Sequence, residues 1–327
     1  MGADADKRCY AGIDIGGTKI LALIASAAGR RLGSATIPTP AHADAVDVVC
    51  AMRDAMELAA RAGEVAPGQI GAVGVAAAGA IDAQHGVIVH SPHLPAFQHT
   101  PVVSMLRKLV DVPVVIGNDA NMAALGEHRF GAGKGISDLL FITISTGIGG
   151  GIIADNRLLL GAGGYAGEVG HMTVHAHGPY GKSTTPGAWE SLCSGTALVR
   201  IVTERMQAGE ASVLASTLAN AGELTAVDVF TAYRAKDALA VAVVREAIAF
   251  TGVALTSLVN ILNPAMLIIG GGLSNEWEDY IAPAVAIMRT QSFAGMGADI
   301  RVVPPTLGAD AGALGAAALA MDSLGER

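Results

Sequence analysis

The sequence Asp14-Ile15-Gly16-Gly17-Thr18-Lys19 lies between two short apolar runs, residues 10–13 and 20–24. Apolar runs of this length, bounded by glycines, are typical of buried strands joined by a tight turn. A Gly-Gly turn leaves its backbone N–H groups uncovered, so an anionic group can approach them closely. Thr18 adds a hydroxyl donor, and Asp14 adds a carboxylate that can hold a metal ion. Hairpins also use Gly-Gly for its backbone freedom alone, so this turn by itself leaves both interpretations open.

The composition favours a two-domain protein that acts on small molecules. The 327 residues suffice for two domains of ordinary size. Hydrophobic residues make up 51% of the chain but aromatic residues only 4%, so the core is expected to consist of Ala, Val, Ile and Leu. The formal net charge is −8 and no basic run occurs, which argues against nucleic acid or an acidic membrane surface as the main partner.

The cysteines and the apolar segments indicate a reduced, aqueous compartment. Cys9, Cys50 and Cys193 are far apart and form neither a disulfide framework nor a Cys-x-x-Cys metal signature. Residues 1–8 are polar and charged, unlike a signal peptide. The alanine-rich run 311–321 is too short to span a bilayer. We therefore expect a soluble, cytoplasmic protein.

Alternating strand and helix patterns predict an α/β fold. Short apolar runs predict strands at 10–13, 20–24, 32–37, 70–77, 112–116, 139–145, 152–154, 266–269 and 300–303. Helical spacing predicts helices at 43–62, 102–110, 122–130, 280–290 and 309–324, and a largely helical region at 189–262. Residues 85–97 and 161–187 are predicted to be loops, and a loop as long as the second is usually functional.

The opening pattern of strand, glycine-rich turn and strand occurs twice. Residues 144–149, Ile-Ser-Thr-Gly-Ile-Gly, match residues 13–18 loosely in letters but closely in pattern. This repeat indicates an internal duplication of one supersecondary unit. A third glycine-rich turn at 270–272 also follows an apolar strand. Glycine-rich turns at strand ends predict ligand contact there, with a nucleotide held in a cleft between two related halves.

Two further stretches place polar side chains where chemistry is expected. Asn118-Asp119 ends a predicted strand and begins a helix, so Asp119 is either a helix N-cap or a carboxylate placed to accept a proton from a hydroxyl group. Glu168-Val169-Gly170-His171 lies in the long loop, and Glu190 follows it. These side chains either bind the hydroxyl groups of a sugar or form an ordinary solvated surface.

Taken together, these motifs resemble those of the ROK family of sugar kinases, within the larger group of hexokinase- and actin-like folds. The matching stretches occur in the family's order over most of the chain: 14–19, 117–121, 146–151, 168–171, Ser194-Gly195-Thr196-Ala197 and Ile269-Gly270-Gly271-Gly272-Leu273.

The resemblance implies a two-lobed ribonuclease-H-like fold, with duplicated βββαβαβα-type domains around a central cleft. We expect a small N-terminal lobe of residues 8–117 and 309–325. A larger C-terminal lobe of residues 118–308 is expected to carry the sugar-binding loop. The resemblance also suggests a homodimer, although the sequence itself shows no interface.

The resemblance also assigns roles to single residues. It implies that Asp119 is the catalytic base that takes the proton from the sugar's 6-hydroxyl, and that Asp14 positions Mg²⁺ through water. The sugar-binding residues are then Asn118, Asp119, Glu168, His171 and Glu190, with Gly79 shaping the pocket. The ATP-binding residues are Gly16, Gly17, Thr18, Lys19, Thr146 and Gly147, with Gly271 and Gly272 near the adenosine.

The chain departs from the family at the zinc site that members usually have. There the histidine that corresponds to His171 joins three cysteines, whose positions are here Gly181, Ser183 and Ala188. None of these residues can ligate zinc, so no zinc is expected. His175 and His177 could belong to a different metal site, but structural zinc wants four ligands and no fourth is evident nearby. Cys193 is expected to serve packing.

The sequence thus predicts an ATP-dependent hexose 6-kinase, with glucose as the first choice of sugar. N-acetylmannosamine, N-acetylglucosamine, mannose, fructose and an amino sugar remain alternatives. A sugar-responsive repressor, the other branch of the family, is disfavoured because only nine residues precede Tyr10 and the net charge is negative. A sugar-binding protein without catalysis is a third alternative, against which the presence of Asp14 and Asp119 counts.

Overall fold

The computed structural model describes residues 8–40, 44–180 and 185–326, which form two compact units. The first unit contains the described residues up to Leu139, Gly151–Gly167 and those from Pro305 onward. The second contains Leu140–Gly150 and the described residues of Glu168–Pro304. This division differs from the predicted lobe boundary at 117/118, since it assigns 118–139 and 151–167 to the first unit.

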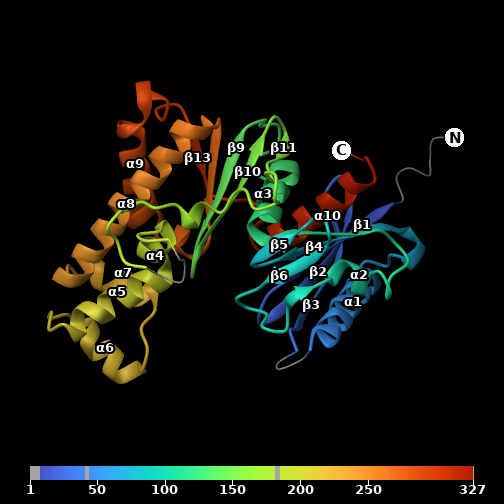
Figure 1. The fold of residues 1–327 in the computed structure, drawn as a ribbon, viewed down its shortest axis with the longest axis horizontal. Coiled ribbons are helices and arrows are strands. Elements are labelled where there is room, and N and C mark those ends of the chain that lie inside the picture. Colours follow the sequence, from blue (N-terminus) through green and yellow to red (C-terminus); the bar gives the residue numbers. More distant parts are fainter. Residues whose placement is uncertain (1–7, 41–43, 181–184, 327) are drawn as a thin grey trace. The chain divides into compact units, whose positions relative to one another are not determined.

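The first unit is built on a sheet in the order β3-β2-β1-β4-β8 (Figure 1). The strands β1, β2 and β3 form an antiparallel meander, and β4 and β8 continue the sheet parallel to β1. Their bounds are β1 (Cys9–Ile15), β2 (Lys19–Ser26), β3 (Arg31–Pro38), β4 (Ile70–Ala77) and β8 (Val114–Asn118). The accompanying helices are α1 (Ala45–Ala62), α2 (Val102–Leu106), α3 (Asp119–Phe130) and α10 (Ala311–Ser323).

Both faces of this sheet are covered, which explains why β4 is apolar along its whole length and β1 is apolar at every position except Asp14. On one face, Ala11, Ile13 and Ile15 of β1 share a core cluster with residues of α1. On the other face, Tyr10 shares a cluster with Ala313 and other residues of α10. The β1–β2 hairpin therefore has a fixed position between two helix layers, and the residues of its turn emerge at the end of the sheet.

The C-terminal helix α10 lies unusually close to the sheet and to α3, as Figure 1 shows for the red helix beside the blue strands. A Cβ atom on Gly74 would stand 1.8 Å from the carbonyl oxygen of Ala316. Only glycine permits this approach, because real Cβ contacts do not occur at such distances. The alanine-rich sequence of α10 serves the same purpose, since small side chains let the helix backbone approach the strands.

The predicted loop at 85–97 contains a strand, so that prediction was wrong in part. A small antiparallel sheet consists of β5 (Ala80–Asp82), β6 (Val87–His90) and β7 (Gln98–Thr100). Ile88 is fully buried in β6 and pairs with Ile81 and Thr100. A four-residue strand flanked by polar residues and prolines gives too short a pattern to separate it from a loop.

The second sheet has the order β11-β10-β9-β12-β13. The bounds are β9 (Leu139–Ile144), β10 (Ile148–Ala154), β11 (Arg157–Leu158), β12 (Met266–Gly270) and β13 (Arg301–Val303). As in the first sheet, the second and third strands in chain order pair antiparallel and the last two pair parallel. The repeated strand order confirms the duplication inferred from the two hairpin sequences.

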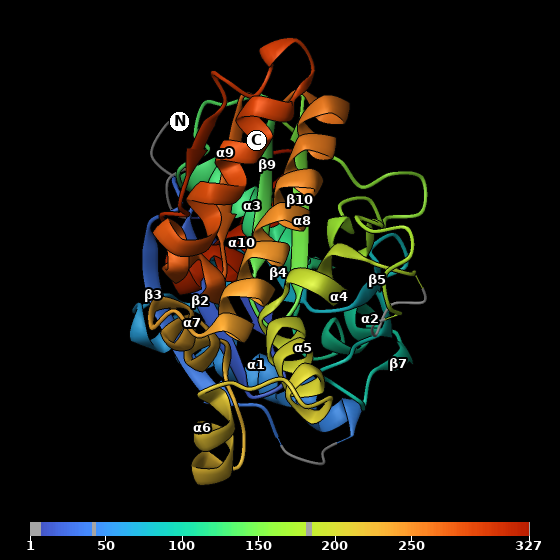
Figure 2. The same ribbon diagram turned by 90° about the vertical axis from the view of Figure 1, so that its left-hand side faces the viewer.

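The helices of the second unit follow its β hairpin, as the region 189–262 predicted. They are α4 (Trp189–Cys193), α5 (Gly195–Gln207), α6 (Leu214–Ala221), α7 (Ala226–Arg234), α8 (Ala238–Leu262) and α9 (Ala282–Gln291). Figure 2 shows α8 and α9 side by side. Between Gly161 and Gly187 the described residues form one short 3₁₀ helix, η3 (Val169–His171), so the predicted loop is confirmed there.

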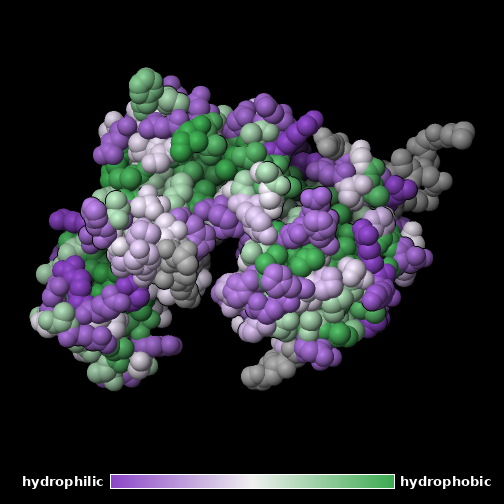
Figure 3. Space-filling view, in the orientation of Figure 1, coloured by the Kyte–Doolittle hydropathy of each residue, from purple (hydrophilic) through white to green (hydrophobic). Residues whose placement is uncertain are grey.

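Helix α8 is long and apolar enough to cross a membrane by length and composition. More than half of its most apolar window is buried within the protein, as in the core helix of a soluble protein. Figure 3 shows hydrophilic and hydrophobic residues interspersed over the visible face. The helix is therefore accounted for by packing against α4, α5, α7 and α9.

The predicted helices agree with the structure except in their bounds. The predicted helix 102–110 ends at Leu106 because Lys108 and Leu109 donate hydrogen bonds to carbonyls three residues back, which tightens the chain into turns. Helix α1 begins at Ala45, and the predicted start at Ala43 lies outside the described residues. Cys193 is fully buried, as expected for a packing residue, and burial raises the pKa of its thiol to about 12.

Candidate active site

The turn between β1 and β2 is held from one side and exposed on the other. The Gly16 amide donates to the carbonyl of Lys19 at 3.0 Å, and the Thr39 hydroxyl donates to the Gly16 carbonyl at 2.7 Å. The Thr39 amide donates to the Thr18 carbonyl at 3.0 Å. Residues 17–19 themselves are exposed. The turn thus has a fixed backbone and an open face, which suits the binding of an anionic group.

Asp14 lies near the end of β1 and is partly buried. A Cβ atom on Gly312 of α10 would lie 2.6 Å from Asp14 Oδ2, so the helix packs directly against the carboxylate. Burial raises the pKa of Asp14 to about 6; the Asp119 carboxylate adds to this rise, and the Lys19 ammonium opposes it. Two neighbouring carboxylates repel each other when both are charged, and such a pair of oxygen ligands suits a hard divalent cation.

Asn118 and Asp119 have different roles at the start of α3. Asn118 is the N-cap, since its Oδ1 accepts the amides of Ala120 at 3.0 Å and Asn121 at 3.2 Å. Its Nδ2 donates to the Gly79 carbonyl at 3.2 Å, which joins α3 to the turn after β4. The N-cap alternative considered for Asp119 therefore belongs to its neighbour.

The Asp119 carboxylate accepts backbone hydrogen bonds at the start of α3. Its Oδ1 accepts the Ala120 amide at 2.9 Å. Burial raises its pKa, while the Ala120 amide and the nearby His93 act in the opposite direction. A carboxylate with a raised pKa is a better proton acceptor than an ordinary one.

In the second unit, the turn after β9 contacts Glu190. The Ile148 amide donates to Glu190 Oε2 at 2.8 Å. A Cβ atom on Gly147 would lie 2.5 Å from the same oxygen, so a side chain there would displace the carboxylate. Glu190 is in the first turn of α4, and no local sequence pattern predicts that it lies against the turn after β9.

Glu168 and His171 are close to the same turn. Their side chains are 3.8 Å apart, from Glu168 Oε2 to His171 Nε2, and both are exposed. Gly170 packs against the carbonyl of Ile148, whose amide binds Glu190. The structure therefore brings the three predicted sugar-binding residues of the second unit together around Ile148.

A pocket of about 510 Å³ opens beside the glycine-rich turns of the second unit. This volume is within the range of small-molecule sites. Thr146 and Gly272, both predicted for ATP, line it together with Ser145. Most of its remaining surface is apolar and comes from α5, the connection between α6 and α7, α7 and the segment after β12, including Val199, Leu224, Val227, Phe230 and Leu273. A flat apolar group such as a nucleobase suits this lining.

Gly271 has the backbone conformation that only glycine adopts readily. Its φ is +88°, and a Cβ atom would lie 2.4 Å from the Ile144 carbonyl oxygen. Its own carbonyl accepts the Ser274 amide at 3.0 Å and the Ser274 hydroxyl at 2.7 Å. The turn after β12 is thus fixed against the end of β9, at the edge of the pocket.

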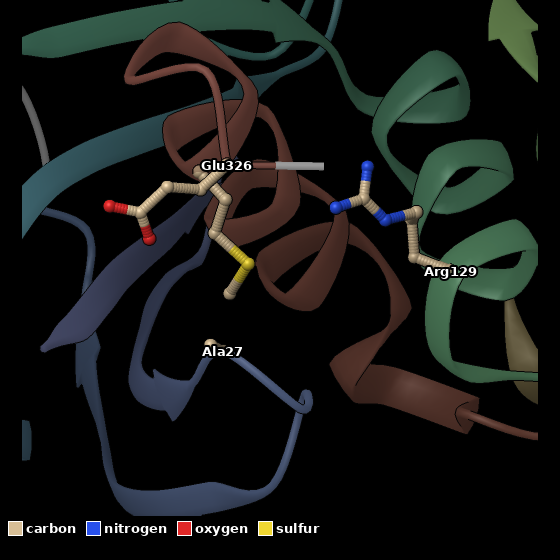
Figure 4. Close-up of a pocket in the computed structure, with 4 residues that line it drawn as sticks. Ala27, Arg129 and Glu326 are labelled. Carbon is tan, nitrogen blue, oxygen red and sulfur yellow. The ribbon is translucent and has the colours of Figure 1, made fainter. Parts of the chain in front are cut away.

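A smaller pocket of about 110 Å³ in the first unit is lined by Ala27, Arg129, Met321 and Glu326 (Figure 4). The Glu326 carboxylate points away from Arg129 in this view. Arg129 pairs with Asp322 at 2.8 Å, and Glu326 pairs with Arg8 at 2.8 Å. Its charged groups are satisfied within the protein and its volume is too small for a nucleotide or a sugar.

The predicted site residues thus fall into two sets. The first unit holds Asp14, Gly16, Gly17, Thr18, Lys19, Gly79, Asn118 and Asp119; the second holds Thr146, Gly147, Glu168, His171, Glu190, Gly271 and Gly272. Their roles stay predictions. Sequence reasoning missed the pocket residues Val199, Leu224, Val227 and Phe230, since they lie in α5, in α7 and in the segment before α7, far in sequence from any glycine-rich turn, and carry no motif.

The residues at the family's zinc positions do not fit a zinc ion. Ala188 is buried and has no ligand atom, and Gly181 and Ser183 lie outside the described residues. His175 stacks on Phe250, with ring centroids 5.3 Å apart. In the part of the chain that the structure describes, no three His, Cys, Asp or Glu residues are grouped as metal ligands. We derive no step through zinc.

Comparison with solved structures defines the class of fold. The chain superposes on the ROK hexokinase of Thermus thermophilus with a TM-score of 0.84 at 31% identity, covering 98% of this chain and 100% of that one. It matches a ROK family glucokinase from Streptomyces griseus, solved with glucose and AMPPNP, with a TM-score of 0.76 at 34% identity over 96% and 99% of the two chains. The predicted two-lobed α/β sugar kinase fold is therefore confirmed.

Sequence comparison then gives the family. The sequence model of the ROK family matches residues 10–323. A glucokinase of Halalkalibacterium halodurans is 36% identical over 316 residues, which cover 94% of this chain and 93% of the relative. The chain belongs to the ROK family, as the motifs predicted.

Proposed function

We propose that this protein is an ATP-dependent hexose kinase that phosphorylates glucose at its 6-hydroxyl group. The observation that carries the proposal is the likeness, over nearly the whole chain, to a glucokinase solved with glucose and an ATP analogue. The glucokinase relative of similar length supports the same sugar. The pocket beside Thr146 and Gly272 supports a nucleotide as the second substrate.

In the proposed reaction, the sugar's 6-oxygen attacks the γ-phosphorus of ATP. The O6–P bond forms, the bond from phosphorus to the β-phosphate oxygen breaks, and ADP leaves. Asp119 accepts the proton of the 6-hydroxyl, and its raised pKa favours that transfer. Asn118 caps α3 and binds the Gly79 carbonyl, so it holds Asp119 in position as well as facing the sugar.

The two turns supply binding rather than covalent chemistry. The exposed residues Gly17 and Thr18 offer backbone amides and the Thr18 hydroxyl to the phosphates, with Lys19 adding positive charge. Thr146 and Gly147 are proposed to do the same from the second unit. Phosphoryl transfer asks a protein mainly for positioning and charge stabilisation, so these groups and one base suffice.

Magnesium is proposed as the metal ion of the reaction. The buried carboxylate of Asp14, beside Asp119, fits a hard cation with oxygen ligands. When bound, Mg²⁺ would neutralise charge on the phosphates of ATP. Asp14 would hold the ion through water, and Lys19 would balance part of the remaining charge.

Glu168, His171 and Glu190 are proposed to bind the other hydroxyl groups of the sugar. Their grouping around Ile148 supports a shared ligand, because carboxylates accept and an imidazole can donate hydrogen bonds to adjacent hydroxyls. The alternatives to glucose remain those named from the sequence. A cytoplasmic location and a homodimer are further proposals.

The test is a panel of hexoses supplied with Mg-ATP, with ADP release as the readout. We expect glucose to give the highest kcat/KM and Asp119→Ala to abolish ADP release with every sugar. His85→Ala, which alters an exposed residue paired with Asp82, is the matched control and should behave like the wild type. The proposal fails if no sugar supports ADP release by the wild-type protein.

A further inference from the structure

His93 lies between the two functional turns of the first unit, although no motif points to it. It follows β6 in the segment Ser91-Pro92-His93. A Cβ atom on Gly17 would lie 2.7 Å from the His93 carbonyl oxygen and 3.1 Å from the His93 Cβ. The backbone of His93 therefore packs directly against the predicted phosphate-binding turn.

The same segment is also fixed against the turn after β4. A Cβ atom on Gly79 would lie 2.2 Å from the His90 carbonyl oxygen and 2.9 Å from the Ser91 Cα. Gly79 in turn accepts a hydrogen bond from Asn118 at the start of α3. Ser91 is buried, so the segment is held firmly just before His93. These contacts form a continuous path from the Gly17 turn to the helix that carries Asp119, entirely within one unit.

The His93 side chain is exposed and near the carboxylate of Asp119, with which it interacts electrostatically. Two other charged groups belong to this surrounding. Asp119 disfavours the charged form of the Asp14 carboxylate, whereas the Lys19 ammonium favours it. His93 thus contacts the turn proposed to hold the phosphates, and its side chain lies near the base proposed to hold the accepting hydroxyl.

We propose that His93 belongs to the reaction centre and donates a hydrogen bond from its imidazole to the phosphoryl group during its transfer. This inference rests on the proposed kinase function and adds a residue to it. An N–H donor at this position stabilises charge that the phosphoryl oxygens carry in the transition state. The imidazole donates in its neutral as well as its protonated form, so its action does not depend on its own titration.

The test compares His93→Ala and His93→Gln with wild type in steady-state assays with glucose and Mg-ATP. Loss of a positioned donor to a transition state costs about 10²-fold in kcat, and we expect a loss of that order for His93→Ala. The KM values for glucose and ATP should change by less than about threefold, because the contact is made mainly in the transition state. His93→Gln keeps an N–H donor, so its kcat should be at least about tenfold higher than that of His93→Ala.

His85→Ala is the control for removal of an exposed histidine, here from the turn between β5 and β6, and it should keep wild-type kinetics. Thermal unfolding of each variant shows whether the fold is intact. A kcat of His93→Ala within threefold of the wild type overturns the inference, as does a loss confined to the KM for glucose. An inactive wild-type protein would instead remove the proposed function, and this inference with it.

Discussion

Replacing Asp14 by asparagine is expected to stabilise the protein while it removes activity. Burial, with a contribution from Asp119, raises the Asp14 pKa from an ordinary value of 3.8 to about 6. The folded state therefore keeps the proton to a higher pH than the unfolded state does. The contribution of Asp14 to the free energy of unfolding is fully present below its unfolded pKa of about 4. It is lost as the pH rises through the folded pKa of about 6. Above that pH the buried charge carries its full cost.

The size of the effect follows from the same values. One pKa unit corresponds to about 1.4 kcal/mol, so a rise from 3.8 to about 6 corresponds to about 3 kcal/mol at neutral pH. Asp14→Asn removes the charge and keeps the shape. Its free energy of unfolding at pH 8 should exceed that of the wild type by up to about 3 kcal/mol. At pH 3.5 the two proteins should be nearly equally stable, because Asp14 is then protonated in both states.

Urea unfolding at pH 3.5, 6 and 8, in buffer that contains a chelator, measures this difference. Asp82→Asn is the control of opposite sign. The amide and the side chain of His85 lower the Asp82 pKa, so its contribution to stability is present at neutral pH and is lost on acidification. Asp82→Asn should therefore lower stability at pH 8. The reasoning is refuted if Asp14→Asn gains nothing at pH 8, or gains equally at pH 3.5.

Three further predictions concern a buried carboxylate, the pocket and zinc. Glu127 is fully buried and accepts hydrogen bonds from the amides of Thr306 and Leu307 at 2.8 and 2.7 Å. In urea unfolding, Glu127→Ala should therefore lower the free energy of unfolding by about 3–5 kcal/mol, and Glu127→Gln should lower it by less. Leu224→Trp fills the pocket beside Thr146, so it should raise the KM for ATP at least about tenfold with little change for glucose, and an unchanged KM for ATP would contradict the nucleotide assignment. Exhaustive treatment with a zinc chelator, followed by return of Mg²⁺, should leave kinase activity intact, whereas activity restored only by added zinc would contradict the account.

Sequence patterns predicted β1, β4, β9 and β12 because these strands are buried along nearly their whole length. The run from Tyr10 to Ile13 is apolar throughout, and the pattern of residues 13–18 recurs at 144–149, which revealed the duplicated topology. The small strand β6 escaped prediction, since four residues give no usable periodicity. Glycines such as Gly74 could be counted but not explained from the sequence, because the helix that packs on Gly74 comes more than two hundred residues later.

The candidate site was predictable only where it lies on motifs. Asn118 and Asp119 were found together, but the sequence could not say which of them caps α3, since both residue types do so. The place of Glu190 beside the Gly147 turn depends on how the loop before α4 folds back, which no local pattern encodes. His93 carries no motif and is significant only through its contact with Gly17.

The central claim is that Asp119 activates a hexose hydroxyl for attack on ATP. Phosphorus NMR of a reaction with glucose, Mg²⁺ and ATP follows the substrates and the product together. The account predicts that the ATP signals give way to equal amounts of ADP and a glucose phosphorylated on its 6-oxygen. It also predicts that Asp119→Ala slows this conversion by at least about 10³-fold. Hydrolysis of ATP to free phosphate without a sugar phosphate, or an Asp119→Ala protein that works at the wild-type rate, would contradict it.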